Sequence, residues 1–180
     1  MAVQRINIRQ LNLEAHIVGL GEPAFRAKQV YEWIWKKQVH DFGQMANIGK
    51  SLQEKLAESY FFDSLSVEDQ QVSTDKTIKC AFGVDGQTQV IEGVLIPTTS
   101  RMTACISSQV GCSLACEFCA TGRLKMMRNL TAGEIVDQVV YLKNLATNNY
   151  NTNLSNIVYM GMGEPLLNYK NVVRSAEILT

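Results

Sequence analysis

Four of the five cysteines of this 180-residue chain lie within one short stretch, residues 103–122 (TACISSQVGCSLACEFCATG). Three of them, Cys112, Cys116 and Cys119, follow the spacing C-x3-C-x2-C. Thiolates this close in sequence can bind one metal centre, but a structural zinc site needs four nitrogen or sulfur ligands. A [4Fe–4S] cluster held by three cysteines leaves one iron open to a small molecule. The spacing favours such a reactive cluster and leaves open a zinc site completed by Cys105 or a distant histidine.

The composition is that of an ordinary globular protein, with 46% hydrophobic residues and 17 basic against 17 acidic residues. An odd number of clustered cysteines is unlike a secreted disulfide framework. No apolar run reaches the ~18 residues that a membrane span needs, and no N-terminal apolar run precedes a small-residue cleavage site. We therefore expect a cytoplasmic protein without membrane contact, and we expect a monomer.

The N-terminal third of the sequence has the spacing of apolar residues that is typical of short helices. One helix is predicted over residues 11–20 and ends at Gly21. Another begins near Ser51, which forms a capping-box pattern with Glu54. We expect a small helical accessory domain over residues 1–75. Its lysines could contact phosphate, although a solvated face is the more common role of such residues.

The next segment is predicted to be a β-hairpin over residues 76–100 that leads into the rest of the fold. Its strands are residues 77–82 and 88–96, and residues 83–86 (GVDG) form a turn signal. Glu92 interrupts an otherwise apolar strand. One interpretation is that it faces solvent or a lysine on an edge strand. The other is that it handles a proton in a dry pocket.

The C-terminal part alternates strands and helices. A strand is predicted over residues 102–107, a capping box at residues 131–134 opens an amphipathic helix, and a second strand covers residues 156–160. Asn168 is predicted to cap a last helix. This order is typical of parallel βα units, so the predicted class is α/β. Two units cannot close a barrel, and we interpret residues 101–180 as the first part of a (β/α) barrel in a longer protein.

The cysteine stretch follows a predicted parallel strand, the place where α/β folds bind their ligands. Directly after it come Arg123, Lys125 and Arg128, with no acid among residues 120–130. A polyanion could therefore be bound locally beside the cysteines.

Several spaced motifs resemble one known family. The pattern Cys112, Cys116, Phe118 and Cys119 resembles the signature of the radical S-adenosylmethionine (SAM) superfamily. Further motifs resemble its RNA adenosine C2-methyltransferases of the RlmN type, to which the C8-methylating Cfr enzymes are related. These motifs are GEPAFRAKQV (21–30), IEGVLIP (91–97), CISSQVGC (105–112), RNL (128–130) and MGMGEPLLN (160–168).

The resemblance implies a radical SAM barrel, here partial, with two cofactors. Cys112, Cys116 and Cys119 would bind a [4Fe–4S] cluster that reductively cleaves SAM to a 5′-deoxyadenosyl radical. Gly163 and Glu164 match the residues that hold the methionyl part of SAM. Phe118 would place an aromatic ring beside the cluster.

The resemblance also implies a ping-pong reaction. One SAM methylates a cysteine that lies beyond this chain, and the radical then acts on that methyl group. Cys105 matches the cysteine that helps to remove the adenine proton and resolves the protein–RNA adduct as a disulfide. Glu92 matches the proton acceptor near the adenine. Cys80 has no counterpart, and it is interpreted as a small buried strand residue.

The implied substrates are adenosines in large-subunit (23S) ribosomal RNA and in tRNA, and the implied electron donor is a flavodoxin or ferredoxin. Because the methyl-carrying cysteine is absent, we expect the 180-residue polypeptide alone not to methylate RNA. Two alternatives remain open at this point: a metal-binding, RNA-binding module without catalysis, and a C8-methylating enzyme of the Cfr type.

Overall fold

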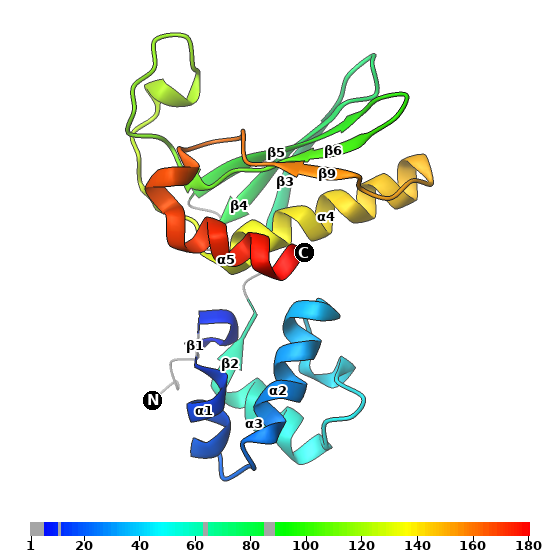
Figure 1. Ribbon diagram of the computed structural model, residues 1–180, viewed down its shortest axis with the longest axis vertical. Coiled ribbons are helices and arrows are strands. Elements are labelled where there is room, and N and C mark those ends of the chain that lie inside the picture. Colours follow the sequence, from blue (N-terminus) through cyan, green and yellow to red (C-terminus); the bar gives the residue numbers. More distant parts are fainter. Residues whose placement is uncertain (1–5, 11, 63–64, 85–88) are drawn as a thin grey trace. The chain divides into compact units, whose positions relative to one another are not determined.

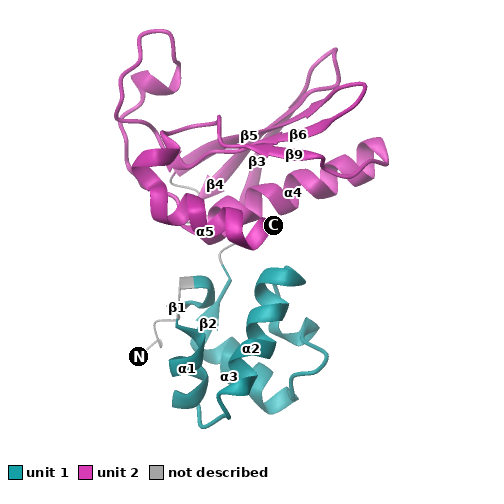
Figure 2. Cartoon of the chain, in the orientation of Figure 1, with its two compact units in different colours: residues 1–64 teal, residues 65–180 magenta. Residues whose placement is uncertain are grey.

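The computed structural model describes residues 6–10, 12–62, 65–84 and 89–180. Figure 1 shows the elements in chain order. The chain divides into two compact units, residues 1–64 and 65–180 (Figure 2). We refer to them as the helical unit and the sheet unit.

Short helices and two short strands form the helical unit. Its described elements are β1 (Ile6–Asn7), η1 (Ile8–Gln10), α1 (Leu13–Gly19), α2 (Phe25–Tyr31), η2 (Glu32–Lys36), η3 (Phe42–Gln44), α3 (Lys50–Ser59) and β2 (Tyr60–Phe61). Strands β1 and β2 pair in parallel. The buried apolar residues are spaced four apart, as the amphipathic pattern predicts. Examples are the pair Val30 and Ile34 and the pair Leu52 and Leu56.

Helix α3 begins one residue earlier than predicted, and the capping box at Ser51 is wrong. Gly49 is the N-cap and has the extended backbone that this position requires (φ −62°, ψ 145°). Gln53 explains this start, because its Nε2 donates to the carbonyl oxygens of Met45 (3.0 Å) and Ile48 (2.9 Å). The side chain thereby ties the incoming chain to the first turn of the helix.

Five strands form the main sheet of the second unit, in the order β3–β4–β5–β6–β9. Neighbours are antiparallel except β6 and β9, which are parallel. Helix α4 lies between β6 and β9 in the sequence, so these three elements form a βαβ unit. The bounds are β3 (Ser66–Val72), β4 (Ile78–Val84), β5 (Gln89–Pro97), β6 (Met102–Cys105), α4 (Ala132–Tyr150), β9 (Asn156–Val158) and α5 (Tyr169–Leu179).

The helices cover one face of this sheet. On β5, Ile91, Gly93 and Leu95 are buried in alternation, whereas Glu92 lies on the opposite face and is partly exposed. Figure 1 shows α4 and α5 on the same side of the sheet, and α4 packs against β5 and β6. The absence of a side chain at Gly93 makes room for the core, since a Cβ atom there would lie 2.7 Å from Cε2 of Phe82.

The capping box predicted at the start of α4 is confirmed. The N–H of Glu134 donates to Oγ1 of Thr131 (3.2 Å), and the N–H of Thr131 donates to Oε2 of Glu134 (2.8 Å). The helix ends at Tyr150, and Asn151 then adopts the left-handed conformation (φ 51°) that asparagine tolerates at a helix end.

The α/β class is confirmed, but the boundary between helical and sheet segments lies earlier than residue 75. Residues 66–72 pair with β4 as strand β3. Their sequence, SVEDQQV, is exposed on both faces and lacks the alternation that marks a half-buried strand. The predicted turn at residues 83–86 lies partly outside the described residues. No helix in the described part of the chain is long and apolar enough to span a membrane.

Cys80 allows one prediction about stability and pH. It lies fully buried on β4, and burial raises the pKa of its thiol to about 11. The folded state therefore disfavours the thiolate. The stability that this group contributes is complete below the pKa of the unfolded thiol, ~8.5, and is lost as the pH rises through the folded pKa.

We expect the free energy of unfolding to fall by up to about 3 kcal/mol from this group between about pH 8 and pH 11. Cys80→Ala should lack this part of the fall. The pKa of Tyr141 is raised by burial and also by the charge of the Cys80 thiolate, and the variant removes only the second of these causes. Urea unfolding at a series of pH values measures the difference. Equal pH slopes for the two proteins would contradict the prediction.

Candidate cluster and cofactor site

The parallel strands β6 and β9 bring two motifs to one edge of the sheet. Cys105 at the end of β6 lies opposite Val158 at the end of β9. The chain continues from β6 toward residues 111–124, the cysteine loop, and from β9 into residues 160–164, the glycine loop. Because ligands of α/β proteins bind beyond the carboxyl ends of parallel strands, this edge is the candidate site.

A two-stranded ribbon closes the base of the cysteine loop. Strand β7 (Gln109–Val110) pairs with β8 (Arg128–Asn129) in antiparallel orientation. Gly111 lies where the loop leaves this ribbon, and its φ of +74° favours glycine. A Cβ atom at Gly111 would overlap the carbonyl oxygen of Lys125. The closed ribbon therefore requires glycine at this position.

Cys116 and Cys119 share one tight turn, in which the N–H of Cys119 donates to the carbonyl oxygen of Cys116 (3.1 Å). Gly122 packs on this turn, since a Cβ atom there would lie 2.7 Å from the same carbonyl oxygen. The backbone N–H of Gly122 hydrogen-bonds the thiol of Cys119 and lowers its pKa, with smaller contributions from Thr121. A lowered pKa favours the thiolate, which is the form that binds metal.

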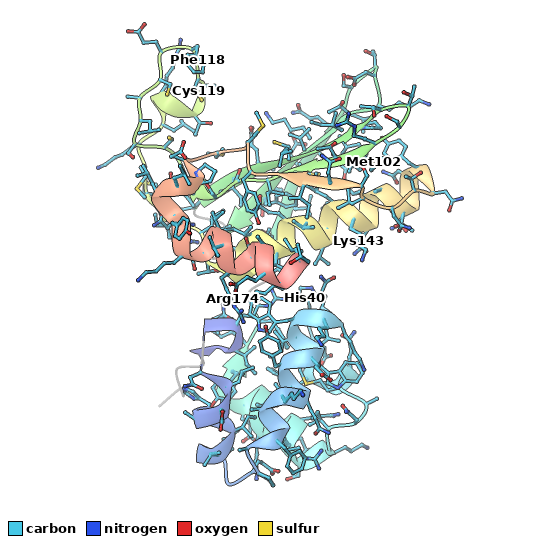
Figure 3. The ribbon with its side chains drawn as sticks, viewed as in Figure 1. His40, Met102, Phe118, Cys119, Lys143 and Arg174 are labelled. Atoms are coloured by element: carbon cyan, nitrogen blue, oxygen red, sulfur yellow. The ribbon has the colours of Figure 1, made fainter. Side chains whose placement is uncertain are left out.

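The chemistry of these donors fits a cluster, but their thiols are not gathered in this structure. Among the described residues, no three Cys, His, Asp or Glu side chains lie close enough together to hold a metal ion. Cys112, Cys116 and Cys119 therefore stay predicted ligands. All five cysteines are free thiols, so the structure gives no support to the expected disulfide. Phe118 is 93% exposed and lies beside Cys119 near the tip of the loop (Figure 3).

The glycine loop approaches the end of β6 closely. The N–H of Gly161 donates to the carbonyl oxygen of Ile106 (3.0 Å), and a Cβ atom at Gly161 would lie 2.8 Å from that oxygen. Gly163 has φ +95°. The carboxylate of Glu164 accepts the N–H of Leu166 (3.0 Å) and caps the short helix η5 (Pro165–Asn168). The predicted contact of Gly163 and Glu164 with SAM is not tested by these observations.

Sequence reasoning missed a buried polar network that joins the end of β6 to α4, to β5 and to the glycine loop. Ser107 and Gln138 are fully buried. The amide of Gln138 pairs with the backbone of Ser107, donating to its carbonyl oxygen (3.0 Å) and accepting its N–H (2.8 Å). Oγ of Ser107 donates to the carbonyl oxygen of Glu92 (2.6 Å) and accepts the N–H of Met162 (2.8 Å). The sequence does contain one sign of this network, because Gln138 is a polar residue on the apolar face of the helix predicted after residues 131–134.

Asn168 does not make the predicted side-chain cap of α5. Its side chain is 3% exposed, and its Nδ2 donates to the carbonyl oxygens of Ser108 and Leu130, both at 2.8 Å. Ser108 precedes the cysteine loop in the chain, and Leu130 follows it. Asn168 thereby links the start of α5 to the chain on both sides of the cysteine loop.

Glu92 and Cys105 lie on the sheet face opposite the core. Oε1 of Glu92 lies 2.5 Å from Nζ of Lys79, and both side chains are nearly half-exposed (44% and 46%). Among the described residues, the carboxylate pairs with a lysine and is not enclosed in a dry pocket. The strand that carries it is not an edge strand, because β5 lies between β4 and β6 in the sheet. Burial raises the pKa of the Cys105 thiol, partly offset by a backbone hydrogen bond from Met160. The catalytic roles of Glu92 and Cys105 remain predictions.

The cationic patch predicted from Arg123, Lys125 and Arg128 is smaller than expected. The guanidinium of Arg128 donates to both carboxylate oxygens of Glu134 (2.9 and 2.6 Å). Glu134 follows the acid-free segment in the sequence. The capping box at the start of α4 holds its carboxylate close to that segment, where it pairs with Arg128. Arg123, in the cysteine loop, and Lys125, directly after it, are exposed.

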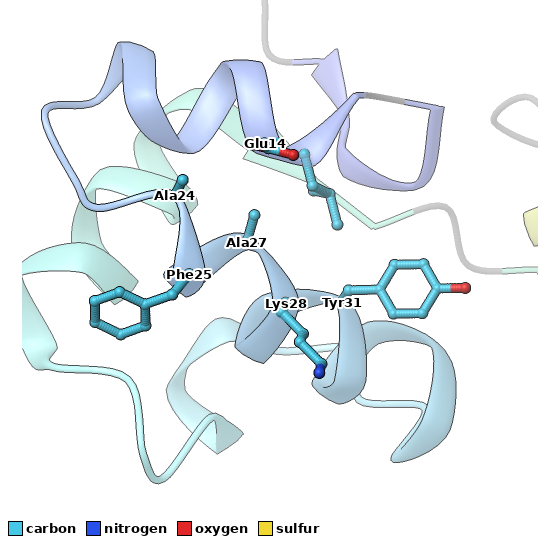
Figure 4. Close-up of a pocket in the computed structure, with 7 residues that line it drawn as sticks. Glu14, Ala24, Phe25, Ala27, Lys28 and Tyr31 are labelled. Atoms are coloured by element: carbon cyan, nitrogen blue, oxygen red, sulfur yellow. The ribbon is translucent and has the colours of Figure 1, made fainter.

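The helical unit has a shallow pocket of its own between α1 and α2 (Figure 4). Its volume is about 440 Å³, and it is lined by Leu13, Glu14, Ala24, Phe25, Ala27, Lys28 and Tyr31. Phe25 is 59% exposed, and the guanidinium carbon of Arg26 lies 5.1 Å from its ring centre. Nζ of Lys37 lies 3.4 Å from the ring centre of Trp33. Trp33 is partly buried, whereas the exposed ring of Phe25 with the cation beside it suits contact with bases and phosphates.

Comparison with known proteins identifies relatives of both units. Residues 5–61 match the model of the ribosomal RNA large subunit methyltransferase N-terminal domain. The chain is 51% identical over 177 residues to the "Probable dual-specificity RNA methyltransferase RlmN" of Cytophaga hutchinsonii, covering 96% of this chain and 48% of that protein. It is 42% identical over 182 residues to the "Dual-specificity RNA methyltransferase RlmN" of Geotalea uraniireducens, covering 99% and 51%.

A solved structure is also similar. The crystal structure of a radical SAM methyltransferase from Sphaerobacter thermophilus superposes with a TM-score of 0.81 at 38% identity, covering 97% of this chain and 52% of that one. The chain spans about half the length of these relatives. The resemblance that the motifs indicated is confirmed over nearly the whole chain: it belongs to the RlmN-type family of radical SAM methyltransferases.

Proposed function

We propose that this chain forms part of an enzyme that methylates C2 of adenosine in 23S ribosomal RNA and in tRNA, with a [4Fe–4S] cluster and SAM as cofactors. One observation carries the proposal. The cysteine loop and the glycine loop follow two paired parallel strands, and residues 107–109, which lead into the cysteine loop, are hydrogen-bonded to Met162 of the glycine loop. The names of the relatives, dual-specificity RNA methyltransferases, support RNA as the substrate.

In this proposal the cysteine loop holds the cluster through Cys112, Cys116 and Cys119. The cluster, when bound, supplies the electron that cleaves SAM. Backbone N–H groups at the end of the loop favour the thiolate of Cys119. The glycine loop would bind the methionyl part of SAM through Gly163 and Glu164, and Phe118 would offer an aromatic ring beside the cluster.

The face opposite the core would receive the adenine. Cys105 lies there as a thiol whose pKa is raised by burial, so it stays protonated near neutral pH until a base takes the proton from its Sγ. Glu92, at the neighbouring strand, would accept the ring proton, with Lys79 beside it. The methylated cysteine of the ping-pong reaction has no candidate among these residues.

The helical unit would contact the RNA, and a flavodoxin or ferredoxin would donate the electron. Exposed Phe25 and Lys28 at the pocket between α1 and α2 offer a ring and a cation to a nucleotide. These contacts would add affinity for RNA without taking part in the reaction.

Deletion of the gene that encodes this chain tests the proposal. We expect 2-methyladenosine to disappear from hydrolysates of 23S ribosomal RNA and of tRNA, as measured by chromatography with mass spectrometry against 2- and 8-methyladenosine standards. Re-expression of the complete wild-type gene should restore it, and the complete gene with Cys116→Ala should not. Loss of 8-methyladenosine instead would identify a C8 enzyme, and restoration by Cys116→Ala would indicate an RNA-binding module without catalysis.

A further inference from the structure

Gln109 lies in a buried position between the cysteine loop and the glycine loop. Its side chain is 1% exposed. Its Oε1 accepts the N–H of Glu164 (2.9 Å), and its Nε2 donates to Oδ1 of Asn129 (2.7 Å). Asn129 belongs to the ribbon at the base of the cysteine loop, so the amide of Gln109 has one partner on each side. A buried amide that loses a partner cannot replace it with water.

The backbone around Gln109 is equally close-packed. Its N–H donates to the carbonyl oxygen of Met162 (3.2 Å). At Gly163, where φ is +95°, a Cβ atom would lie 2.5 Å from Cβ of Gln109 and 2.9 Å from its backbone nitrogen. No room remains for the glycine loop to shift relative to Gln109 without breaking these contacts.

This geometry connects two predicted cofactor ligands. Gln109 precedes the predicted cluster ligand Cys112 by three residues, and it holds the amide of Glu164, which the proposed function assigns to SAM. A binding site needs its contacting groups held by a supporting shell whose own conformation is fixed. Gln109 has the burial and the two bonds that such a support requires.

We propose that Gln109 is a positioning residue that fixes Glu164 relative to Cys112 and thereby sets how tightly SAM binds beside the cluster. This inference rests on the proposed function. Gln109 acts through the Glu164 amide and through Asn129, and it does not contact a cofactor itself. Its loss should therefore weaken SAM binding without preventing cluster assembly.

Three variants separate positioning from general stability. Gln109→Met has a similar shape and removes both hydrogen bonds. Gln109→Glu keeps an acceptor for the Glu164 N–H, and Asn129 can rotate its amide to donate to the new carboxylate. Gln71→Met replaces an exposed glutamine on β3 and is the matched control.

The first readout needs no cofactor. In hydrogen exchange followed by NMR, Gln109→Met should raise the exchange rate of the Glu164 amide by about 10-fold or more, because it loses its acceptor. The Met162 amide should keep its rate, because its acceptor is Ser107. Gln109→Glu and Gln71→Met should leave both rates near those of the wild type.

The second readout is the change that SAM causes in the electron paramagnetic resonance spectrum of the reduced, reconstituted cluster. Gln109→Met should bind SAM about 10-fold more weakly, a loss of 1.4 kcal/mol by the standard conversion, with unchanged iron content. Gln109→Glu should recover most of the affinity. If Gln109→Met does not fold, Asn129→Ala at an exposed position takes its place and should weaken SAM binding several-fold.

The outcomes distinguish the inference from the function on which it rests. Unchanged exchange at Glu164, or unchanged SAM affinity, would overturn the positioning role while wild-type SAM binding upholds the proposed function. Exchange that rises throughout β5 and β6 would show a purely structural role and would also overturn it. Wild-type protein with a full cluster and no SAM binding would refute the proposed function and the positioning role together.

Discussion

Replacing Gln138 with leucine is expected to lower the free energy of unfolding by about 3–5 kcal/mol, because it leaves two buried polar groups unpaired. In the wild type, the amide of Gln138 satisfies both the N–H and the carbonyl oxygen of Ser107, and neither residue is exposed to solvent. Leucine has a similar size but offers neither donor nor acceptor. The same loss should also loosen the glycine loop, since Ser107 accepts the N–H of Met162.

Urea unfolding followed by circular dichroism measures this effect. Asn144→Leu is the control, since Asn144 is exposed on the same helix, and it should change the stability by no more than about 0.5 kcal/mol. A Gln138→Leu protein as stable as this control would show that the network contributes little to the sheet unit.

Gly111→Ala is expected to reduce the iron bound after reconstitution by about 10-fold or more, which corresponds to a loss of at least 1.4 kcal/mol in binding. Alanine at φ +74° carries a strain of about 1–2 kcal/mol. In addition, its Cβ would overlap the backbone oxygen of Lys125. Backbone atoms cannot move aside as a flexible side chain can, so the β7–β8 ribbon must open.

An open ribbon separates Cys112 from the turn that carries Cys116 and Cys119, and three-point binding of a cluster then becomes unfavourable. Gly49→Ala provides the control, because no atom lies within 4 Å of a Cβ placed there and its φ is −62°. Iron and sulfide per chain, measured after anaerobic reconstitution, report the effect. Wild-type iron content in Gly111→Ala would show that the closed ribbon is not needed.

Local signals in the sequence predicted much of the fold. The capping box of α4 depends on residues three apart, and β5 is one continuous run of residues that favour strands, so both could be recognised along the chain. Strand β3 could not, because its polar residues acquire their pairing only from β4. The start of α3 was misplaced because Gln53, and not Ser51, fixes it through carbonyls before the helix.

The hydrogen-bonded residues that support the two loops could not be predicted from the sequence for a related reason. Gln138 and Ser107 are 31 residues apart, Gln109 and Glu164 are 55 apart, and Asn168 and Ser108 are 60 apart. The first pair depends on the packing of α4 against β6, and the other two depend on the parallel alignment of β6 with β9. The motifs predicted which loops would form the site, whereas the residues that support these loops became visible only in three dimensions.

The most direct test is SAM cleavage by the reconstituted protein. The wild type and Cys116→Ala are incubated anaerobically with iron and sulfide, then with dithionite and SAM, and 5′-deoxyadenosine is measured by chromatography. We predict that the wild type becomes brown and releases 5′-deoxyadenosine, and that Cys116→Ala releases none above the protein-free control. A wild-type protein that holds stoichiometric zinc and leaves SAM intact, or equal cleavage by both proteins, would contradict a radical SAM centre in this loop.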